Sequence, residues 1–462
     1  MHRTRRRLAA LALPLAATIA LAGCAGGTGT APEASAPADE PAAPRASEAQ
    51  ARTPRIAITY DGGIRVLDAM SLEQVGDIEL EGFNRLNPAG DGRHLFVSTA
   101  GGFRLLDAGT WAEAHGDHHH YWVAGPVLTD HLHEAEKPGH VVVHEGRTAL
   151  FDDGTGDVTV LDAAHLGDDD AVVREHTTPS AHHGVAIELS DHSLVVSEGT
   201  EDARTGIRVL DAEGQEIAAS DQCPGVHGEA VAADEAVVIG CEDGALVYAG
   251  GTITKVQAPD AYGRIGNQAG TEASPVVLGD YKSDPDADLE RPTRVSLIDT
   301  RDASLTLVDL PASYTFRSLA RGDAGEALVL GTDGQLHVID PETKQLVKSI
   351  PVMDAWTEPD EWQEPRPAVL ALDGSVYVTD PAAKAIHAVD VESGKVWKTV
   401  TLDVVPNELS GVSGTDETQG HGRSDHGDEE HAHEEHAHDE HGHDHGDEHA
   451  HEGDEHDHDH EG

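Results

Sequence analysis

The fold is decided by a stretch of two short apolar runs joined by a tight turn, IAITYDGGIRVLD at residues 56–68. The turn Asp61-Gly62-Gly63 separates the two runs, and apolar and polar residues alternate along the second run. This pattern predicts a strand, a tight turn and a second strand.

The second of these strands recurs along the chain and sets the length of a repeat. Six further copies that end in Asp lie at residues 103–107, 158–162, 207–211, 295–299, 336–340 and 386–390. A weaker copy at residues 245–248 lacks the final Asp. From Asp68 to Asp390 the eight copies have an average period of 46 residues, which is typical of a β-propeller. No long segment has the 3.6-residue period of a helix, so we expect an all-β propeller of eight blades, or of seven if one copy is spurious.

The propeller is predicted to span residues 55–412 and to close between its two ends. The first unit begins at its second strand, so its innermost strand is missing. Residues 404–412 follow the eighth unit and are expected to supply that strand. Closure of this kind removes exposed strand edges.

Residues 1–24 have the features of a targeting segment. Arg3, Arg5, Arg6 and Arg7 precede an apolar run, and Leu21-Ala22-Gly23-Cys24 resembles a bacterial lipoprotein signal with lipidation at Cys24. An ordinary secretory signal with a chance cysteine is the alternative. We expect an extracytoplasmic protein, lipid-anchored to the outer face of the bacterial cell membrane, in the periplasm or at the cell surface. Residues 25–54, rich in Ala, Pro, Gly, Ser and Glu, are predicted to be a disordered linker.

The other end of the chain is a histidine-rich acidic tail. Residues 413–462 contain 14 His and 19 Asp or Glu against a single Arg, with almost nothing apolar. Such a segment cannot bury a core, so it is predicted to be disordered, and its composition is that of a metal-binding tract. The formal net charge of −54 excludes nucleic acid as a partner, because binding to phosphates needs Lys and Arg.

Two cysteines remain after the targeting segment, Cys223 and Cys241. In an oxidising compartment an even remainder of two predicts a disulfide. The alternative is that Cys223, which lies just before His227, is a thiolate metal ligand.

Three histidines stand at the start of equivalent apolar runs: His140 in PGHVVV, His183 in AHHGVAIE and His227 in GVHGEA. They are 43 and 44 residues apart, so in a repeat of this period they occupy one position in the third, fourth and fifth blades, at the mouth of the central channel. Three converging imidazoles form a zinc-like ligand set that a carboxylate or a water completes. Three separately satisfied polar residues at a wet mouth are the alternative.

Further candidate ligands surround these three. Glu229 should share the side of the strand that carries His227 and is the first candidate carboxylate, with Glu408 of the closing strand as a weaker one. His182, next to His183, is also a candidate ligand. Imidazole with carboxylate suits Zn²⁺ best, with Ni²⁺ or Cu²⁺ as alternatives by affinity, and three methionines in the whole chain argue against Cu(I).

A second histidine cluster, HGDHHHYW at residues 115–122, is expected in the connection that leads into the third blade. In an extended strand His118 and His120 point the same way, as chelation requires, and Asp117 could accept a hydrogen bond from a ligand's second ring nitrogen. We expect either a second metal site or an access route to the first; a solvated polar loop is the alternative.

Together these parts resemble the AztD-type zinc metallochaperones, on the stretches DHHHY (117–121), AHHGV (181–185) and CPGVHG (223–228). These are exported β-propellers that bind zinc and deliver it to the solute-binding protein of a zinc ABC importer. The resemblance covers most of residues 55–411 and implies zinc binding in the propeller, transfer by ligand exchange and no enzymatic activity. The long histidine-rich tail departs from what the family needs, so either the propeller or the tail could supply the transferred ion.

We therefore expect a monomeric zinc metallochaperone whose partner is the importer's solute-binding protein. Two alternatives belong to other classes. A metal-dependent propeller hydrolase or lactonase would need an open coordination position and a general acid or base, for which Glu229 could serve, but no nucleophile motif is present. A cell-surface interaction propeller would leave the histidines without a shared role.

Overall fold

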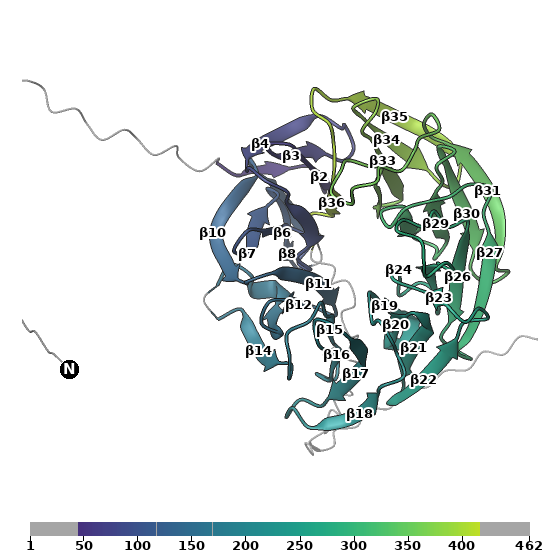
Figure 1. Ribbon diagram of the computed structural model, residues 1–462. Helices are drawn as coiled ribbons and strands as arrows, with labels where there is room; N and C mark the ends of the chain where they lie inside the picture. Colours follow the sequence, from purple (N-terminus) through teal and green to yellow (C-terminus); the bar gives the residue numbers. More distant parts are fainter. Residues whose placement is uncertain (1–44, 117, 169, 416–462) are drawn as a thin grey trace, which may run out of the picture.

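The computed structural model describes residues 45–116, 118–168 and 170–415, which form a ring of antiparallel sheets around a central opening (Figure 1). This part of the chain contains eight sheets with a path of four strands each, and within a sheet the strands follow one another from the channel outward. The predicted all-β propeller is therefore confirmed. The helical turns among the described residues are η1 (Ala163–His165) and η2 (Ala233–Glu235).

The first four sheets are, from the channel outward, β36 (Leu409–Val412), β2 (Arg55–Tyr60), β3 (Gly63–Asp68) and β4 (Gln74–Glu79); β5 (Arg85–Pro88), β6 (His94–Thr99), β7 (Gly102–Asp107) and β10 (Val127–Glu134); β11 (Pro138–His144), β12 (Arg147–Asp152), β13 (Asp157–Asp162) and β14 (Val172–Thr177); and β15 (Ala186–Glu188), β16 (Leu194–Gly199), β17 (Arg204–Leu210) and β18 (Glu216–Ser220).

The other four sheets are β19 (Glu229–Ala232), β20 (Ala236–Cys241), β21 (Asp243–Ala249) and β22 (Thr252–Gln257), with β23 (Gly263–Arg264) beside β21; β24 (Gln268–Ala269), β25 (Val276–Asp280), β26 (Arg294–Asp299) and β27 (Ser304–Asp309); β28 (Leu319–Arg321), β29 (Ala327–Leu330), β30 (Gln335–Asp340) and β31 (Gln345–Pro351); and β32 (Val369–Leu372), β33 (Ser375–Asp380), β34 (Ala385–Asp390) and β35 (Lys395–Thr401).

The ring closes through its two chain ends, as expected from the missing first strand. β36 pairs antiparallel with β2, so that Arg55 lies opposite Val412 and Ile58 opposite Leu409. The first sheet thus takes its innermost strand from the far end of the propeller region. Because β36 pairs with β2, the inner edge of β2 is not left open to pair with another chain.

The core lies between neighbouring sheets, because each sheet buries both faces. Ile56 and Ile58 of β2 pack with Ile386 and Ala388 of β34, whereas Ala57 between them packs with residues of the following sheet. Strands that are covered on both faces have continuous runs of apolar residues rather than a strict alternation of apolar and polar residues. This explains the short Val, Ile and Leu runs that mark each repeat.

The channel has two mouths, which the order of the strands distinguishes. The connection from an outermost strand leads to the start of the next innermost strand, and the chain after an innermost strand turns back into the second strand. We call the mouth where innermost strands begin the histidine mouth, since His140, His183 and His227 lie there. The other is the tail mouth, where the described chain ends at Thr415 after β36.

A separate sheet of three strands is not one of the eight sheets that form the ring. β8 (Thr110–His115) and β9 (His118–Val123) form a hairpin, and β1 (Ser47–Ala49) pairs with β9. The hairpin lies between β7 and β10 of the second sheet, so the expectation that residues 115–122 lead into the third blade is wrong. The chain leaves the sheet after β7, forms the hairpin and then returns to pair β10 with β7.

The predicted boundaries need two changes. Residues 47–49, placed in the disordered linker, form β1, and Ser413–Gly414, placed in the tail, pack at the tail mouth, where Gly414 N–H donates to the Gly92 carbonyl at 2.8 Å. Cys24 and the histidine-rich residues 416–462 lie outside the described part of the chain. Among the described residues, no helix has the length and apolar content needed to cross a membrane.

Candidate metal centre

Three consecutive sheets bring one histidine each to the histidine mouth. His140 lies on β11, His183 lies just before β15 and His227 just before β19. Their ring centroids are 5.0 Å (His140 to His183), 5.0 Å (His183 to His227) and 5.9 Å (His140 to His227) apart, and one nitrogen of each lies within 4.8 Å of the others. The structure therefore brings the three predicted ligands together.

Two of these rings are oriented by acceptors behind them. The Nδ1 of His183 lies 2.5 Å from Asp153 Oδ2, and the Nδ1 of His227 lies 2.5 Å from the Gly266 carbonyl oxygen. Because a carboxylate or a carbonyl can only accept, each Nδ1 carries the proton and each Nε2 carries a lone pair. This is the arrangement of a metal-binding histidine whose second nitrogen is fixed by an outer partner.

The two Nε2 atoms of His183 and His227 face each other at 3.2 Å. Two lone pairs at this distance repel unless a proton or a cation lies between them. A tetrahedral zinc ion with Zn–N bonds of about 2.0–2.1 Å places its nitrogens about 3.3 Å apart. The distance of 3.2 Å between the two Nε2 atoms is thus close to the distance between two nitrogens bound to one tetrahedral zinc ion.

The third ring, His140, contacts a carboxylate instead. Its Nδ1 lies 2.9 Å from Glu229 Oε2. Burial is the largest single influence on His140 and lowers its pKa, but the charge and the hydrogen bond of Glu229 and the charge of Asp153 together outweigh it, so the pKa is raised above its usual value. For His227, burial and then the charge of His140 lower the pKa well below the usual value. His227 is therefore a neutral ligand at pH 7, whereas a metal ion must displace a more tightly held proton from His140.

Glu229, the carboxylate expected to complete the metal's coordination, lies beside the cluster, with Oε2 2.9 Å from the Nδ1 of His140. It contacts a ligand ring but is not one of the three residues whose ligand atoms lie within 4.8 Å of one another. The ligand group in the described part of the chain consists of three histidines. A fourth coordination position is therefore left for water or for an incoming ligand.

Two other candidate ligands do not reach the cluster. His182 is buried, with Nδ1 2.9 Å from the Ser180 carbonyl oxygen and Nε2 2.9 Å from Ser197 Oγ, so both ring nitrogens are used within the protein. Glu408 pairs with Arg317 and lies 3.7 Å from Arg85. Its carboxylate neutralises the buried Arg317, which explains its place just before the closing strand.

The loop that carries His227 is fixed by a disulfide. Cys223 and Cys241 are bonded, which confirms the predicted pair and excludes the alternative of a thiolate ligand at Cys223. The backbone N–H of His227 donates to the Gly240 carbonyl at 3.1 Å, next to the second cysteine. The loop is therefore attached to β20 at two points close to the ligand.

The position of His183 depends on the glycine that follows it. A Cβ at Gly184 would lie 2.2 Å from the ring of Phe151, so only glycine lets the chain pass over this ring. Asp153, which orients His183, follows β12 in the preceding sheet. The Asp153 carboxylate and the Gly266 carbonyl were missed by sequence reasoning, because only the ring geometry places them behind the two histidines.

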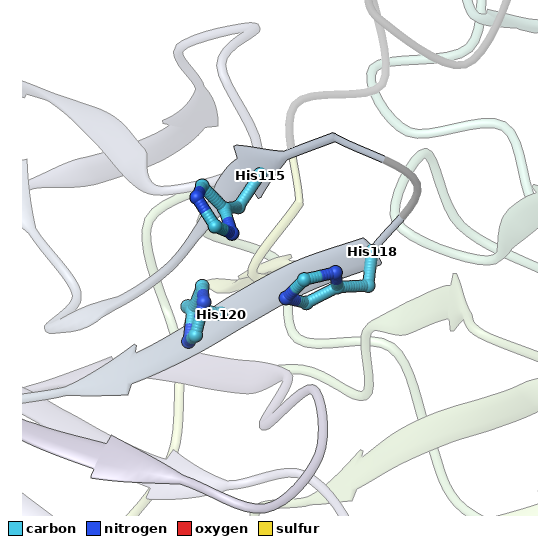
Figure 2. A group of neighbouring side chains, drawn as sticks. All are labelled: His115, His118 and His120. Atoms are coloured by element: carbon cyan, nitrogen blue, oxygen red, sulfur yellow. The ribbon is translucent and has the colours of Figure 1, made fainter.

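A second histidine cluster lies on the β8–β9 hairpin (Figure 2). His115 lies opposite His118 in the hairpin register, His120 follows on the same face, and the three ring centroids are 5.1–5.4 Å apart. The Nδ1 of His120 lies 2.7 Å from Glu48 Oε1 of β1, which orients that ring. Sequence reasoning found His118 and His120 but missed His115 and Glu48, since both depend on strand pairing.

The remaining residues of this hairpin lie apart from the cluster. His119 points to the other face and stacks on Tyr121, with 6.4 Å between the ring centroids. Asp117, expected to orient a ligand, lies outside the described residues. The cluster is more exposed than the one at the histidine mouth, so it has the solvent access of a capture site.

A closed ring of sheets with three imidazoles converging at one mouth of its channel defines the class of this protein, a β-propeller with a candidate metal centre. No family model matches the chain.

The comparisons with individual proteins are more specific. The chain is 26% identical over 369 residues to the zinc chaperone AztD of Citrobacter koseri, a match that covers 77% of this chain and 85% of that protein. The crystal structure of Citrobacter koseri AztD is similar with a TM-score of 0.68 and 25% identity, over 78% of this chain and 98% of that one. The structure of apo AztD from the same organism gives a TM-score of 0.67 and 24% identity, over 79% and 99%. The resemblance to the AztD-type zinc metallochaperones is thus confirmed.

Proposed function

We propose that this protein is an extracytoplasmic zinc metallochaperone, which captures zinc and hands it to the solute-binding protein of a zinc ABC importer. The observation that carries the proposal is the set of three histidines, two of which have Nδ1 hydrogen-bonded and Nε2 atoms at a spacing that fits tetrahedral zinc. Similarity to a protein named a zinc chaperone supports the same conclusion.

Transfer follows from the coordination that the site offers. Three protein ligands leave one position open, so a ligand of the acceptor protein can bind the ion before any histidine lets go. The side chain of His183 is 39% exposed, which makes it the ligand that an approaching protein reaches. Stepwise replacement of His183, His227 and His140 would then move the ion without releasing it to water.

The rest of the chain fits this role. The tail, with 14 histidines, would bind several ions weakly and raise the zinc concentration near the propeller. A lipid at Cys24 would keep a monomeric carrier beside its importer in the membrane.

A metal-dependent hydrolase is the second candidate, with Glu229 as its general base. A general base must reach the water at the open metal position. Glu229 Oε2 instead lies 2.9 Å from the Nδ1 of His140, where it pairs with a ligand ring. This placement favours a carrier over a hydrolase.

The test is a transfer assay with the apo solute-binding protein of a zinc ABC importer in the presence of a zinc chelator. The unmodified protein is expected to pass its ion to the acceptor faster than the chelator removes it. The triple variant His140→Ala/His183→Ala/His227→Ala should lose one tight ion and the transfer, because the site is gone.

A matched control replaces three histidines that lie outside both clusters, His165→Ala/His176→Ala/His192→Ala. This variant is expected to transfer zinc as the unmodified protein does. If the variant His140→Ala/His183→Ala/His227→Ala transfers zinc as the unmodified protein does, the three converging histidines do not supply the ion.

A further inference from the structure

The central channel holds a cavity of about 930 Å³ that is lined by residues from both halves of the channel. It is lined at the histidine mouth by Glu229 and at the tail mouth by Glu145 and Ser413, with Val141 to Val143 of β11 between them. Six consecutive residues of one strand-and-turn segment, 141–146, border the cavity. Residues 141–144 belong to β11, and at roughly 3.3 Å per residue they correspond to about 10–13 Å of channel.

The ionisable side chains of the cavity wall belong to only two chemical types. They are the carboxylates Glu145, Glu229 and Glu272 and the imidazoles of His94 and His144. Among the residues that the structure describes, no Lys or Arg lines the cavity. Carboxylate oxygens and imidazole nitrogens are ligands for divalent cations. A cleft whose charges share one sign also concentrates ions of the opposite sign.

The wall histidines are held in place by carboxylates. His144 Nε2 lies 2.8 Å from Glu235 Oε1, and His94 Nδ1 contacts Asp91. These contacts orient the rings and add negative charge beside the tail mouth. An ion at this mouth would therefore meet oriented ligands.

Each end of the cavity adjoins a part of the chain rich in metal ligands. At one end Glu229 lines the cavity and also contacts His140 of the three-histidine cluster. At the other end Gly92 and Ser413 line it, and the chain continues past Thr415 into the segment that contains 14 histidines. The tail therefore begins at the mouth opposite to the cluster.

We propose that the channel admits divalent cations at the tail mouth and leads them to the three-histidine cluster, with Glu229 as the last carboxylate on the path. The proposal rests on the proposed function, because the cluster must bind the ion that arrives. It gives tail and propeller successive roles: the tail gathers ions at one mouth, and the cluster presents one ion to the acceptor at the other. Loading and delivery would then use different faces of the protein.

Charge reversal at either mouth of the full chain tests this route. The variant Glu145→Lys/Glu272→Lys places positive charge in the wall at the tail mouth. The matched variant Glu361→Lys/Glu364→Lys makes the same change at exposed positions between β31 and β32, on the side of the histidine mouth. The probe is Co²⁺, since a tetrahedral site of histidines gives a visible absorption band that weakly bound, hydrated Co²⁺ lacks.

The rate at which this band appears after rapid mixing is the measured quantity. The tail-mouth variant is expected to load about tenfold more slowly than the unmodified protein, because it loses the attraction that concentrates cations in the channel. Its band at equilibrium should be unchanged, since no ligand is altered. The histidine-mouth variant is expected to load within about twofold of the unmodified rate, as its charges lie outside the channel.

Normal loading by the tail-mouth variant, or slow loading by the histidine-mouth variant alone, would overturn the proposal and leave the proposed function intact. Absence of the band from the unmodified protein would overturn the three-histidine site and the channel as its supply. If the double Lys variant gives no band at equilibrium, Glu145→Gln/Glu272→Gln decides the question. This milder change must also slow loading if the route is correct.

Discussion

At the scale of single residues, the site is defined by what stands behind each histidine. A carboxylate, a carbonyl and a second carboxylate hold the three Nδ1 atoms, so the Nε2 atoms of His183 and His227 already face each other. Because the rings are oriented in advance, metal binding does not have to order them. Glu229 raises the pKa of the His140 ring that it contacts.

Replacement of Glu229 by Gln is expected to change the pH dependence of zinc binding. In the unmodified protein the raised pKa of His140 means that zinc affinity falls as the pH falls, beginning above the ordinary imidazole value of 6.5. Without the carboxylate the proton is held less tightly, so this loss of affinity should move to lower pH. At high pH the variant should bind about 10–100-fold more weakly, because the ring has lost its outer partner.

The measurement is the zinc dissociation constant across this pH range, by competition with a chromophoric chelator. Glu79→Gln, at an exposed position of β4, is the control and should match the unmodified protein. An unchanged pH profile in Glu229→Gln would show that this carboxylate does not control the proton on His140.

At the scale of elements, two short segments hold ligands outside the regular strands. The loop before β19 carries His227 and is closed by the disulfide between Cys223 and Cys241, which are 18 residues apart. The β8–β9 hairpin carries a second cluster and is covered along one edge by β1. Each segment depends on an attachment that can be removed by substitution.

Removal of the disulfide in Cys223→Ser/Cys241→Ser should lower the free energy of unfolding by about 3 kcal/mol, because a closed loop of this length restricts the unfolded chain. Zinc affinity should fall as well, since the loop that holds His227 is loosened. Chemical denaturation and chelator competition measure the two effects. Gln222→Ser, at the exposed neighbouring position, is expected to change neither the free energy of unfolding nor the zinc affinity. Normal stability of the double cysteine variant would contradict the stabilising role of the disulfide.

Substitution of Glu48 tests whether the hairpin is a metal site. Glu48→Gln should weaken binding at His115, His118 and His120 about 10–100-fold, because the His120 ring loses the carboxylate that orients it. The three-histidine site should keep its affinity. Zinc titration of the variants Glu48→Gln and His118→Ala distinguishes the hairpin site from the three-histidine site. If both variants bind as many zinc ions as the unmodified protein, the hairpin is not a metal site.

At the scale of the whole molecule, the closed ring separates two mouths with different chemistry. The histidine mouth carries the converging imidazoles, and the tail mouth is where the described chain ends at Thr415. The propeller carries three histidines in a fixed arrangement, and the sequence that follows Thr415 contains 14 more. Flexible ligands bind more weakly than preorganised ones, because they must be ordered on binding.

Removal of residues 416–462 should lower the number of zinc ions bound while one tight ion remains at the propeller. The cut is placed after Thr415 because Ser413 and Gly414 pack at the tail mouth. Stoichiometry and affinity by chelator competition are the measurement. Loss of all tight binding on truncation would locate the tight site in the tail and contradict the site at the histidine mouth.

The sequence by itself determined the repeat, the ring closure and the three converging histidines. Asp-Gly turns between short apolar runs are local signals, and a constant spacing places equivalent residues at equivalent points of a ring. The pairing of Cys223 with Cys241 likewise followed from the two cysteines that remain after the predicted targeting segment, in a chain expected to be exported. These features depend on residues close in sequence or on a regular period.

Only the tertiary structure decided what the other polar residues do. Asp153 and Gly266 come from neighbouring sheets, Glu229 contacts the ring of His140, and Glu408 pairs with Arg317. The β8–β9 hairpin leaves the period of the repeat, so its place outside the ring was not predictable from spacing. The physical reason is common to all of these. A ring brings residues of different sheets within hydrogen-bonding distance, and their spacing in the sequence does not indicate which of them come into contact.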